Sequence, residues 1–369
     1  MGYVAARGGH GAIEAAEQLV RSLRWAGRSN WLQVDQIVER LGLAVDRVQS
    51  EGGLWAPELA ARALRQAEGD VIEAAQLLRT FRSTLPRFAY SQPIDADELR
   101  VLRRVVPAYR NPPGPQLLGR TVDYTGRLLE LLPDEPSPAP STETETAESA
   151  LAESMSTAID RHPARLLEVL RDADLVVDRR RADDPEPFDI TRSAVRPPAA
   201  RSARLATMAR AETGALVNLW YRNILGPDSH LHEITLGEVR HGHLPVRIVH
   251  PITGGDVTIG RVRVTEIEAI EDLNGIDEDR TRLDVGYGMC FGHNERKAIA
   301  MANLDIAVER ANSPALEQSI LMTTDGLDAS GFIEHLKLPH YVTFRSIVER
   351  KLAVRDALER SNEKEPVPQ

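Results

Sequence analysis

Residues 133–150, PDEPSPAPSTETETAESA, constrain the fold of this 369-residue chain more than any other segment. They combine Pro, Ser, Thr and Glu, contain no basic residue, and offer almost no apolar side chain to a core. Burial of so little apolar surface cannot offset the conformational entropy lost on ordering. The segment is therefore predicted to be a flexible linker between two packing units, as suits a chain longer than the about 250–300 residues of one core.

Helical periodicity dominates the part of the chain before this segment. Apolar residues recur every three or four positions over residues 12–25, 31–50 and 57–85, a spacing that places them on one face of a helix. Residues 111–132 begin with a Pro/Gly turn and end in an apolar stretch that favours one more short helix. We therefore predict a mostly helical N-terminal domain over residues 1–132.

The part after the linker changes its period and predicts a mixed domain over residues 151–360. PVRIVH (245–250) alternates, and the following ITGGD supplies a Gly-Gly turn, which together favour an antiparallel β-meander. The other expected elements are helices over 151–172 and 203–222, a strand over 285–292, a helix over 294–311, a loop, and a last helix over 343–360. Residues 361–369 are expected to be a disordered tail. The predicted fold class is α+β, with helices flanking the meander.

The charge and the cysteine content exclude several classes of protein. A net charge of -10 argues against a DNA- or RNA-binding protein, which needs a basic field to release counterions. The single cysteine, Cys290, cannot form an internal disulfide, a cysteine-based zinc site or an iron–sulfur cluster within this chain. There is no run of about 18 apolar residues to span a membrane and no apolar secretory leader, so a cytoplasmic location is expected.

The segment GYGMCFGHNERKAIAMANLDIAVER (286–310) carries the clearest local signal. A glycine-rich strand runs into a helix, and Asn294 stands where the N-cap of that helix is expected. Glu295 suits the positive end of the helix dipole. Arg296 and Lys297 do not, because the dipole disfavours cations in the first turn.

Two explanations of these first-turn cations stay open. An anion such as a nucleotide phosphate, placed between the turn and the glycines Gly286 and Gly288, would resolve the conflict. Solvation of both side chains on the surface would resolve it too. Lysine is scarce, with only four among the 45 basic residues, so Lys297 and Lys337 stand out.

Five of the ten histidines lie within residues 230–250. An H-x-H spacing on a strand places both rings on one face, as some zinc sites require. The alternative is that these histidines occupy polar positions on a half-exposed sheet.

A second histidine pair lies in HLKLPHYVTF (335–344). His335 and His340 stand five residues apart, which on a continuous helix would separate their rings by about 140°. Pro339 discourages helical conformation at the residue before it, so the chain can turn there. Both imidazoles can then reach one metal ion or phosphate, with Lys337 nearby. Two unrelated, half-buried histidines are the alternative.

Eight segments are similar, in the same order, to segments of one family. They are MGYVAARGGHGAIEAA, LAVDRVQSEGGL, QAEGDVIEAAQLLRTFRSTL, GPQLLGRTVDYTGRLLE, DITRS, GEVRHG, GYGMCFGHNERKAIAMA and DGLDASGFIEHLKLPHYV. Long, varied words such as GHNERKAIAMA and HLKLPHYV make a chance match a poor explanation. On these segments the chain resembles the PhnI family of the bacterial carbon–phosphorus lyase system.

The resemblance implies an enzyme acting on ATP or GTP, held with Mg²⁺. Proteins of this family displace the purine base at C1′ of the ribose with methylphosphonate, giving ribose 1-methylphosphonate 5-triphosphate. Alone they act as nucleosidases, because water replaces the phosphonate. The family also implies a homodimer within a complex with subunits of the PhnG, PhnH, PhnJ, PhnK and PhnL types. Radical C–P cleavage belongs to a separate cysteine-rich subunit.

The resemblance implies roles for two pairs of residues. The metal-binding histidines of the family map onto His335 and His340, and zinc is the expected ion. Glu295 and Asp325 lie in matching segments and are candidate catalytic carboxylates. Loss of the base passes through an oxocarbenium-like sugar, whose positive charge a carboxylate can stabilise.

Candidate nucleotide-binding residues lie in the same segments. Arg296, Lys297 and Lys337 can neutralise the triphosphate, and Gly286 and Gly288 allow close approach of a ligand. Two other functions stay open: a non-catalytic scaffold of the same complex, and an unrelated metal hydrolase that uses the histidines of residues 230–250.

Overall fold

The chain forms an antiparallel sheet flanked by helices. The computed structural model describes residues 9–121, 126–129, 131, 164–177, 185–225, 234–272, 281–311, 313–337 and 341–362. The acidic segment 133–150, most of the helix predicted over 151–172 and the predicted tail beyond residue 362 lie outside these ranges. The α+β fold class is confirmed.

Two compact units make up the chain, and their boundaries differ from the predicted domain limits. The larger unit comprises residues 34–327, and the smaller unit joins residues 1–33 to residues 328–369. Segments on both sides of the acidic stretch thus belong to the larger unit. The linker itself stays a prediction.

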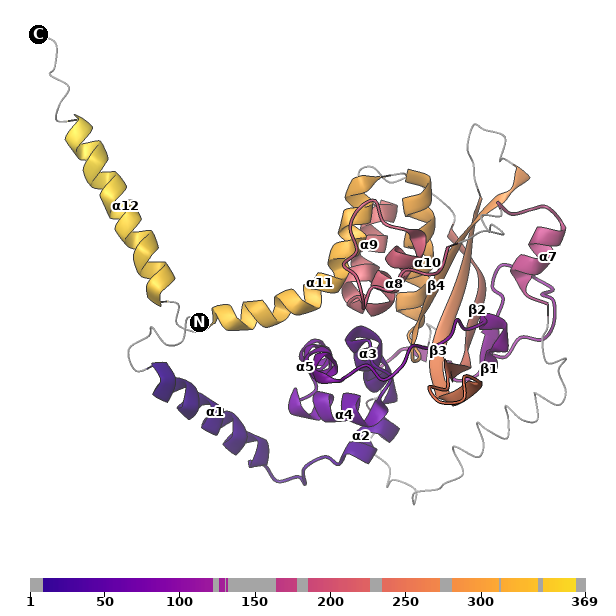
Figure 1. The fold of residues 1–369 in the computed structure, drawn as a ribbon, viewed down its shortest axis with the longest axis horizontal. Helices are drawn as coiled ribbons and strands as arrows, with labels where there is room; N and C mark the ends of the chain where they lie inside the picture. The colour runs from indigo at the N-terminus through magenta and orange to yellow at the C-terminus, as the bar shows by residue number, and fades with distance from the viewer. Residues whose placement is uncertain are drawn as a thin grey trace, which may run out of the picture. The chain divides into compact units, whose positions relative to one another are not determined.

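Four short helices form the first part of the larger unit (Figure 1). They are α2 (Val34–Arg40), α3 (Gly42–Gly52), α4 (Pro57–Gln66) and α5 (Val71–Thr84). The Asp70 carboxylate caps α5 by accepting hydrogen bonds from the N–H groups of Ile72 and Glu73. The helix predicted over 31–50 is thus two helices, and the described part of 111–132 contains no α-helix.

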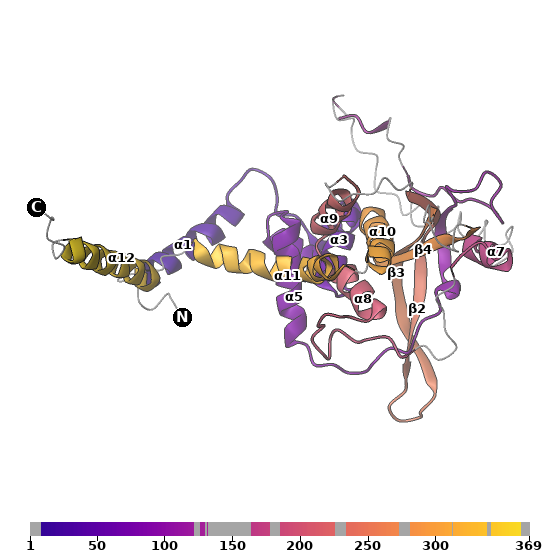
Figure 2. The ribbon, with the colours of Figure 1, turned by 90° about the horizontal axis from the view of Figure 1, so that it is seen from above.

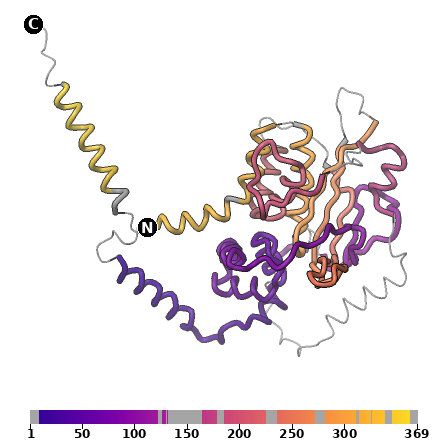
Figure 3. Tube along the Cα trace, in the orientation of Figure 1, coloured from indigo at the N-terminus to yellow at the C-terminus, as the bar shows by residue number. Residues whose placement is uncertain are grey.

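The sheet has the order β1-β2-β3-β4, and every neighbouring pair is antiparallel. Its strands are β1 (Arg100–Val105), β2 (Ile234–Val249), β3 (Asp256–Asp272) and β4 (Leu283–Phe291). The end of β2 and β3 form the predicted meander, and β4 is the strand predicted over 285–292. β1 was not predicted: it is far from β2 in sequence yet lies beside it (Figure 3).

Helices cover the two faces of this sheet unequally. One face packs against α10 (Glu295–Ala311), with α8 (Arg201–Arg210) and α9 (Thr213–Leu225) next to it, whereas α7 (Leu166–Asp172) lies on the other side (Figures 1 and 2). The core on the α10 face includes Val239, Ile267, Met301 and Leu304. The helix predicted over 203–222 is divided at Ala211, where α8 ends.

The register decides which polar side chains share a face. Arg103, His241, Thr265 and Cys290 lie opposite one another on the four strands. Since Cys290 packs in the core with α10, this row faces α10. The next residues along the strands point to the opposite face, toward α7.

The smaller unit consists of helical segments: α1 (Gly9–Trp25), α12 (Tyr341–Asn362) and the end of α11 (Pro314–Leu336). The prediction of a loop between residues 311 and 343 is wrong, because α11 occupies most of this range. Among the helices that the structure describes, none is long and apolar enough to cross a membrane.

Candidate active site

The turn between β4 and α10 is held by hydrogen bonds within the chain. The N–H of His293 donates to the Asp46 carboxylate at 2.9 Å, and the N–H of Asn294 donates to Thr265 Oγ1 at 3.2 Å. Asn294 is the predicted N-cap, since its Oδ1 accepts from the N–H of Lys297 at 3.2 Å. Three donors of this turn are therefore satisfied without the anion suggested by the sequence.

Glycines Gly286 and Gly288 serve the packing of α10 on β4. A Cβ at Gly286 would lie 1.9 Å from the carbonyl oxygen of Ala302, and one at Gly288 would lie 2.2 Å from that of Ala298. Both glycines are buried beneath the helix. The close approach of the helix and the strand explains why both positions are glycine. Neither glycine is therefore placed to contact a nucleotide.

Glu295 is held as an ionised carboxylate in the first turn of α10. Arg103 Nε donates a hydrogen bond of 2.6 Å to its Oε1, and His293 Nε2 lies 3.8 Å from the same atom. Burial opposes ionisation, but His293 and Arg103 together lower the pKa of Glu295 to about 2. Its side chain keeps 27% of its surface exposed, so a substrate can reach it. Glu295 can stabilise positive charge but cannot supply a proton near neutral pH.

A stacked pair of imidazoles adjoins this carboxylate. The rings of His241 and His293 lie 4.5 Å apart, and His241 is buried while His293 keeps 21% of its side chain exposed. Burial, followed by the charges of His293 and Arg263, lowers the pKa of His241 to about 3. His241 is therefore neutral, and only His293 of the two is placed to exchange a proton with a ligand.

The tautomer of His241 follows from its hydrogen bond to Thr265. The hydroxyl of Thr265 donates to the carbonyl oxygen of Gly292 at 2.7 Å, which uses its single proton. His241 Nδ1 lies 3.0 Å from the same hydroxyl oxygen and must then be the donor. The lone pair of this imidazole is consequently on Nε2.

Lys297 lies inside the protein rather than on a ligand-binding surface. Its side chain has 0% exposure, and Nζ donates to Ser50 Oγ at 2.9 Å. Burial lowers the pKa of Lys297 to about 8, while nearby Cys290 and Glu51 favour the charged form. The lysine thus cannot contact a triphosphate in this conformation. Its neighbour Arg296 is exposed.

The remaining predicted residues lie away from the β4–α10 turn in sequence. Asp325 is a residue of α11, and its side chain is not among those described. His335 is half-buried in the last turn of that helix, 6.0 Å from the Phe332 ring. Exposed Lys337 forms an ion pair with Glu334, and His340 lies outside the described residues.

The histidines of residues 230–250 divide into those outside and those inside the described ranges. His241 and His243 share a face of β2, as predicted from their spacing. His250 Nδ1 accepts hydrogen bonds from two N–H groups of its own turn. In the parts of the chain that are described, no three His, Cys, Asp or Glu side chains come together as a metal site.

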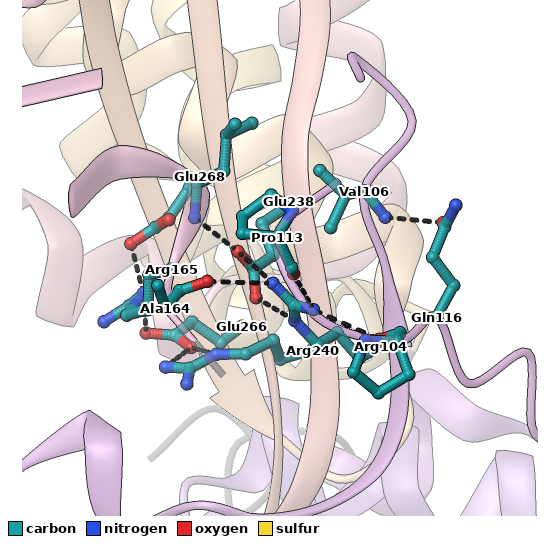
Figure 4. Close-up of polar contacts among 12 residues, drawn as sticks. Arg104, Val106, Pro113, Gln116, Ala164, Arg165, Glu238, Arg240, Glu266 and Glu268 are labelled. Atoms are coloured by element: carbon teal, nitrogen blue, oxygen red, sulfur yellow. Dashed lines mark hydrogen bonds and ion pairs between the residues drawn. The ribbon is translucent and has the colours of Figure 1, made fainter. Parts of the chain in front are cut away.

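A second polar cluster lies on the α7 face of the sheet (Figure 4). Arg104 pairs with Glu238 at 2.8 Å, and Arg240 Nε bonds Glu266 at 2.6 Å. Arg165, which precedes α7, pairs with both Glu266 and Glu268. These buried ion pairs join three strands to α7.

One carboxylate of this α7-face cluster has an unusual ionisation. Burial and the charges of Glu266 and Glu238 raise the pKa of Glu268 to about 7, although Arg165 opposes the shift. Its Oε2 is buried without a hydrogen-bond partner.

Comparison with known proteins now decides the family. The sequence matches the family described as "Bacterial phosphonate metabolism protein (PhnI)" over residues 2–358. The chain belongs to the PhnI family. It is 39% identical over 355 residues to the alpha-D-ribose 1-methylphosphonate 5-triphosphate synthase subunit PhnI of Rhizobium meliloti, covering 93% of this chain and 92% of that protein.

Two further relatives have similar coverage. The protein of the same name from Escherichia coli is 38% identical over 356 residues, which is 94% of this chain and 96% of the relative. A Stutzerimonas stutzeri protein called HtxH is 40% identical over 366 residues, 96% of each chain. The β4–α10 turn therefore belongs to a chain that is similar to PhnI proteins along nearly its whole length.

Proposed function

We propose that this chain is the subunit that displaces the purine base of ATP or GTP at the ribose C1′ with methylphosphonate. The product is alpha-D-ribose 1-methylphosphonate 5-triphosphate. The observation that carries the proposal is the match to two PhnI subunits named for that synthase, at 38–39% identity over more than nine-tenths of each chain.

The geometry around Glu295 suits this chemistry. In the reaction the bond between C1′ and the base nitrogen breaks, the base takes up a proton, and a phosphonate oxygen bonds to C1′. Positive charge develops on the sugar as the base departs, and an ionised carboxylate lowers the energy of that state. Glu295 is such a carboxylate, with a pKa of about 2. His293, which lies beside it and is partly exposed, is the group we assign to donate a proton to the leaving base.

Without partner subunits the same site would release free base, because water takes the place of the phosphonate. Cleavage of the C–P bond would then belong to another subunit of the carbon–phosphorus lyase system. The one cysteine of this chain, Cys290, is buried. The cytoplasmic location expected from the sequence and the homodimer implied by the family resemblance are parts of this proposal.

Zinc at His335 and His340 remains part of the proposal. The support is the segment HLKLPH, in which His335 occupies the last turn of α11 and Pro339 follows the end of that helix. A zinc ion there needs further ligands from a partner or substrate. Metal analysis of the purified chain and its His335→Ala variant tests the assignment, since zinc content should fall in the variant.

Incubation of the purified chain with ATP or GTP tests the activity. Free adenine or guanine should appear, and addition of methylphosphonate with the partner subunits should divert the ribose into the 1-methylphosphonate 5-triphosphate. Failure to release base, alone or with partners, at nucleotide concentrations that bind would contradict the proposal and favour a scaffold.

A further inference from the structure

Basic side chains converge on the sheet face beside Glu295. Arg100 on β1 lies opposite His243 on β2, and His243 lies opposite Arg263 on β3. Arg261 precedes Arg263 by two residues and so points to the same face. We call these four residues the arginine–histidine row.

This row continues the candidate active site. His243 follows His241 by two residues on the same strand, so the two imidazoles share a face about 7 Å apart. Arg263 likewise precedes Thr265, the partner of His241, by two residues. The row is therefore the next rung of the sheet beyond the His241–His293 pair and Glu295.

The three arginines of the row all act on the ionisation of His243. Burial, followed by the charges of Arg263, Arg100 and Arg261, lowers the pKa of His243. All three guanidinium groups must lie close enough to His243 to repel its proton. Two neighbouring strand spacings make the rung from Arg100 to Arg263 about 10 Å wide.

The charges that act most strongly on His243 are mostly positive: those of Arg263, Arg100 and Arg261 oppose its protonation, and that of Asp46 favours it. Asp46 accepts from Arg263 Nη2 at 2.7 Å with both oxygens, but Arg263 Nε is buried without a hydrogen-bond partner. Glu295 is already bonded to Arg103. In a chain with a net charge of -10, a local concentration of cations on one face attracts anions.

We propose that Arg100, Arg261 and Arg263 bind the triphosphate of the nucleotide whose ribose lies at Glu295. This inference rests on the proposed function. Guanidinium groups present paired N–H donors that match phosphate oxygens, whereas Lys297 Nζ is buried and donates to Ser50 Oγ. The row thus takes the place of Lys297 and Lys337 as the phosphate-binding element.

The test is a binding titration with the full chain and the double variant Arg100→Gln/Arg261→Gln. Both side chains are exposed, so their replacement should not prevent folding. Inorganic tripolyphosphate, ATP and adenosine are the three probes. Kd for tripolyphosphate and for ATP should rise about tenfold for each arginine removed, and Kd for adenosine should stay unchanged.

A matched control separates specific contacts from net charge. Arg192→Gln/Arg282→Gln removes two positive charges elsewhere on the surface, where Arg282 pairs with Asp174 and Arg192 stacks on Tyr90. Equal weakening in the control, unchanged tripolyphosphate affinity in the double variant, or no tripolyphosphate binding by the wild type would each overturn the inference.

The two proposals can fail separately. Base release by the wild type, together with unchanged ATP affinity in the double variant, would leave the proposed reaction standing and remove the phosphate site. Weakened tripolyphosphate binding without any base release would support the phosphate site and contradict the reaction.

Discussion

Arg103 Nε donates a 2.6 Å hydrogen bond to the carboxylate of Glu295, and so joins the first strand of the sheet to the first residue of α10. Arg103 side-chain exposure is 12%, which leaves the ion pair only partly screened by water. The strand thereby fixes both the position and the charge of the proposed catalytic carboxylate.

Replacement of Arg103 should change the pH profile of base release. In the wild type Glu295 stays ionised down to about pH 2, so its titration causes no loss of activity between pH 4 and 8. His293 and Arg103 both lower the pKa of Glu295, and Arg103→Gln removes the second of them, so this pKa should rise part of the way toward its ordinary value of 4.5. Initial rates of base release should then fall below about pH 5 in the variant. An unchanged profile would show that Arg103 does not hold the charge of Glu295.

Alanine variants of Lys297 and Arg296 should differ in their free energy of unfolding rather than in their affinity for nucleotide. Lys297→Ala leaves a cavity beside Ser50 and Glu51 and should lower the free energy of unfolding by about 2–4 kcal/mol. Arg296→Ala removes an exposed side chain and should change it by less than about 0.5 kcal/mol. Urea unfolding measures both. The Kd of the folded Lys297→Ala variant for nucleotide should equal that of the wild type. A large increase in this Kd would show that Lys297 does contact the nucleotide.

Glu268 should make the protein less stable at alkaline pH. Its pKa is about 7 in the folded state against 4.5 unfolded, so the folded state binds the proton more tightly. The resulting stabilisation is complete below pH 4.5 and is lost as the pH rises through 7, on the order of 3 kcal/mol in all. Glu268→Gln cannot ionise, and its unfolding free energy should fall less between pH 5 and 8 than that of the wild type.

The exposed carboxylate Glu58 offers a control for this measurement. Glu58→Gln should keep the wild-type dependence of stability on pH. If Glu268→Gln also keeps it, the α7-face cluster does not hold a protonated carboxyl group.

Sequence periodicity predicted the helices and the meander where one apolar stripe or a clear alternation exists. It missed β1, because RVLRRV places Arg103 and Arg104 on opposite faces, where ion pairs rather than apolar contacts hold the half-buried Arg103 and the buried Arg104. It also missed α11, whose sequence includes Gly326 and Gly331, poor helix formers that the local pattern cannot reconcile with a long helix.

The candidate site was only partly predictable for a related reason. The segment GHNER pointed to Glu295 and to the N-cap Asn294, both of which are local signals. Arg103, the partner of Glu295, comes from β1, and His241, which stacks on His293, comes from β2. Strand register across such separations in sequence cannot be obtained from a single sequence. Lys297 was a candidate because lysine is scarce in this chain. Whether a first-turn residue faces the core or the solvent depends on tertiary packing, here on the contact of Lys297 with Ser50 of α3.

The most direct test of the whole account compares Glu295→Gln with the wild type in base release and in ATP binding. The glutamine keeps the size of the side chain and removes its charge, so kcat should fall by about 10²–10³ while Kd for ATP stays within about twofold. Such a split would show that the charge acts in the transition state. A variant that releases base at the wild-type rate would contradict the assignment of Glu295 as the catalytic carboxylate.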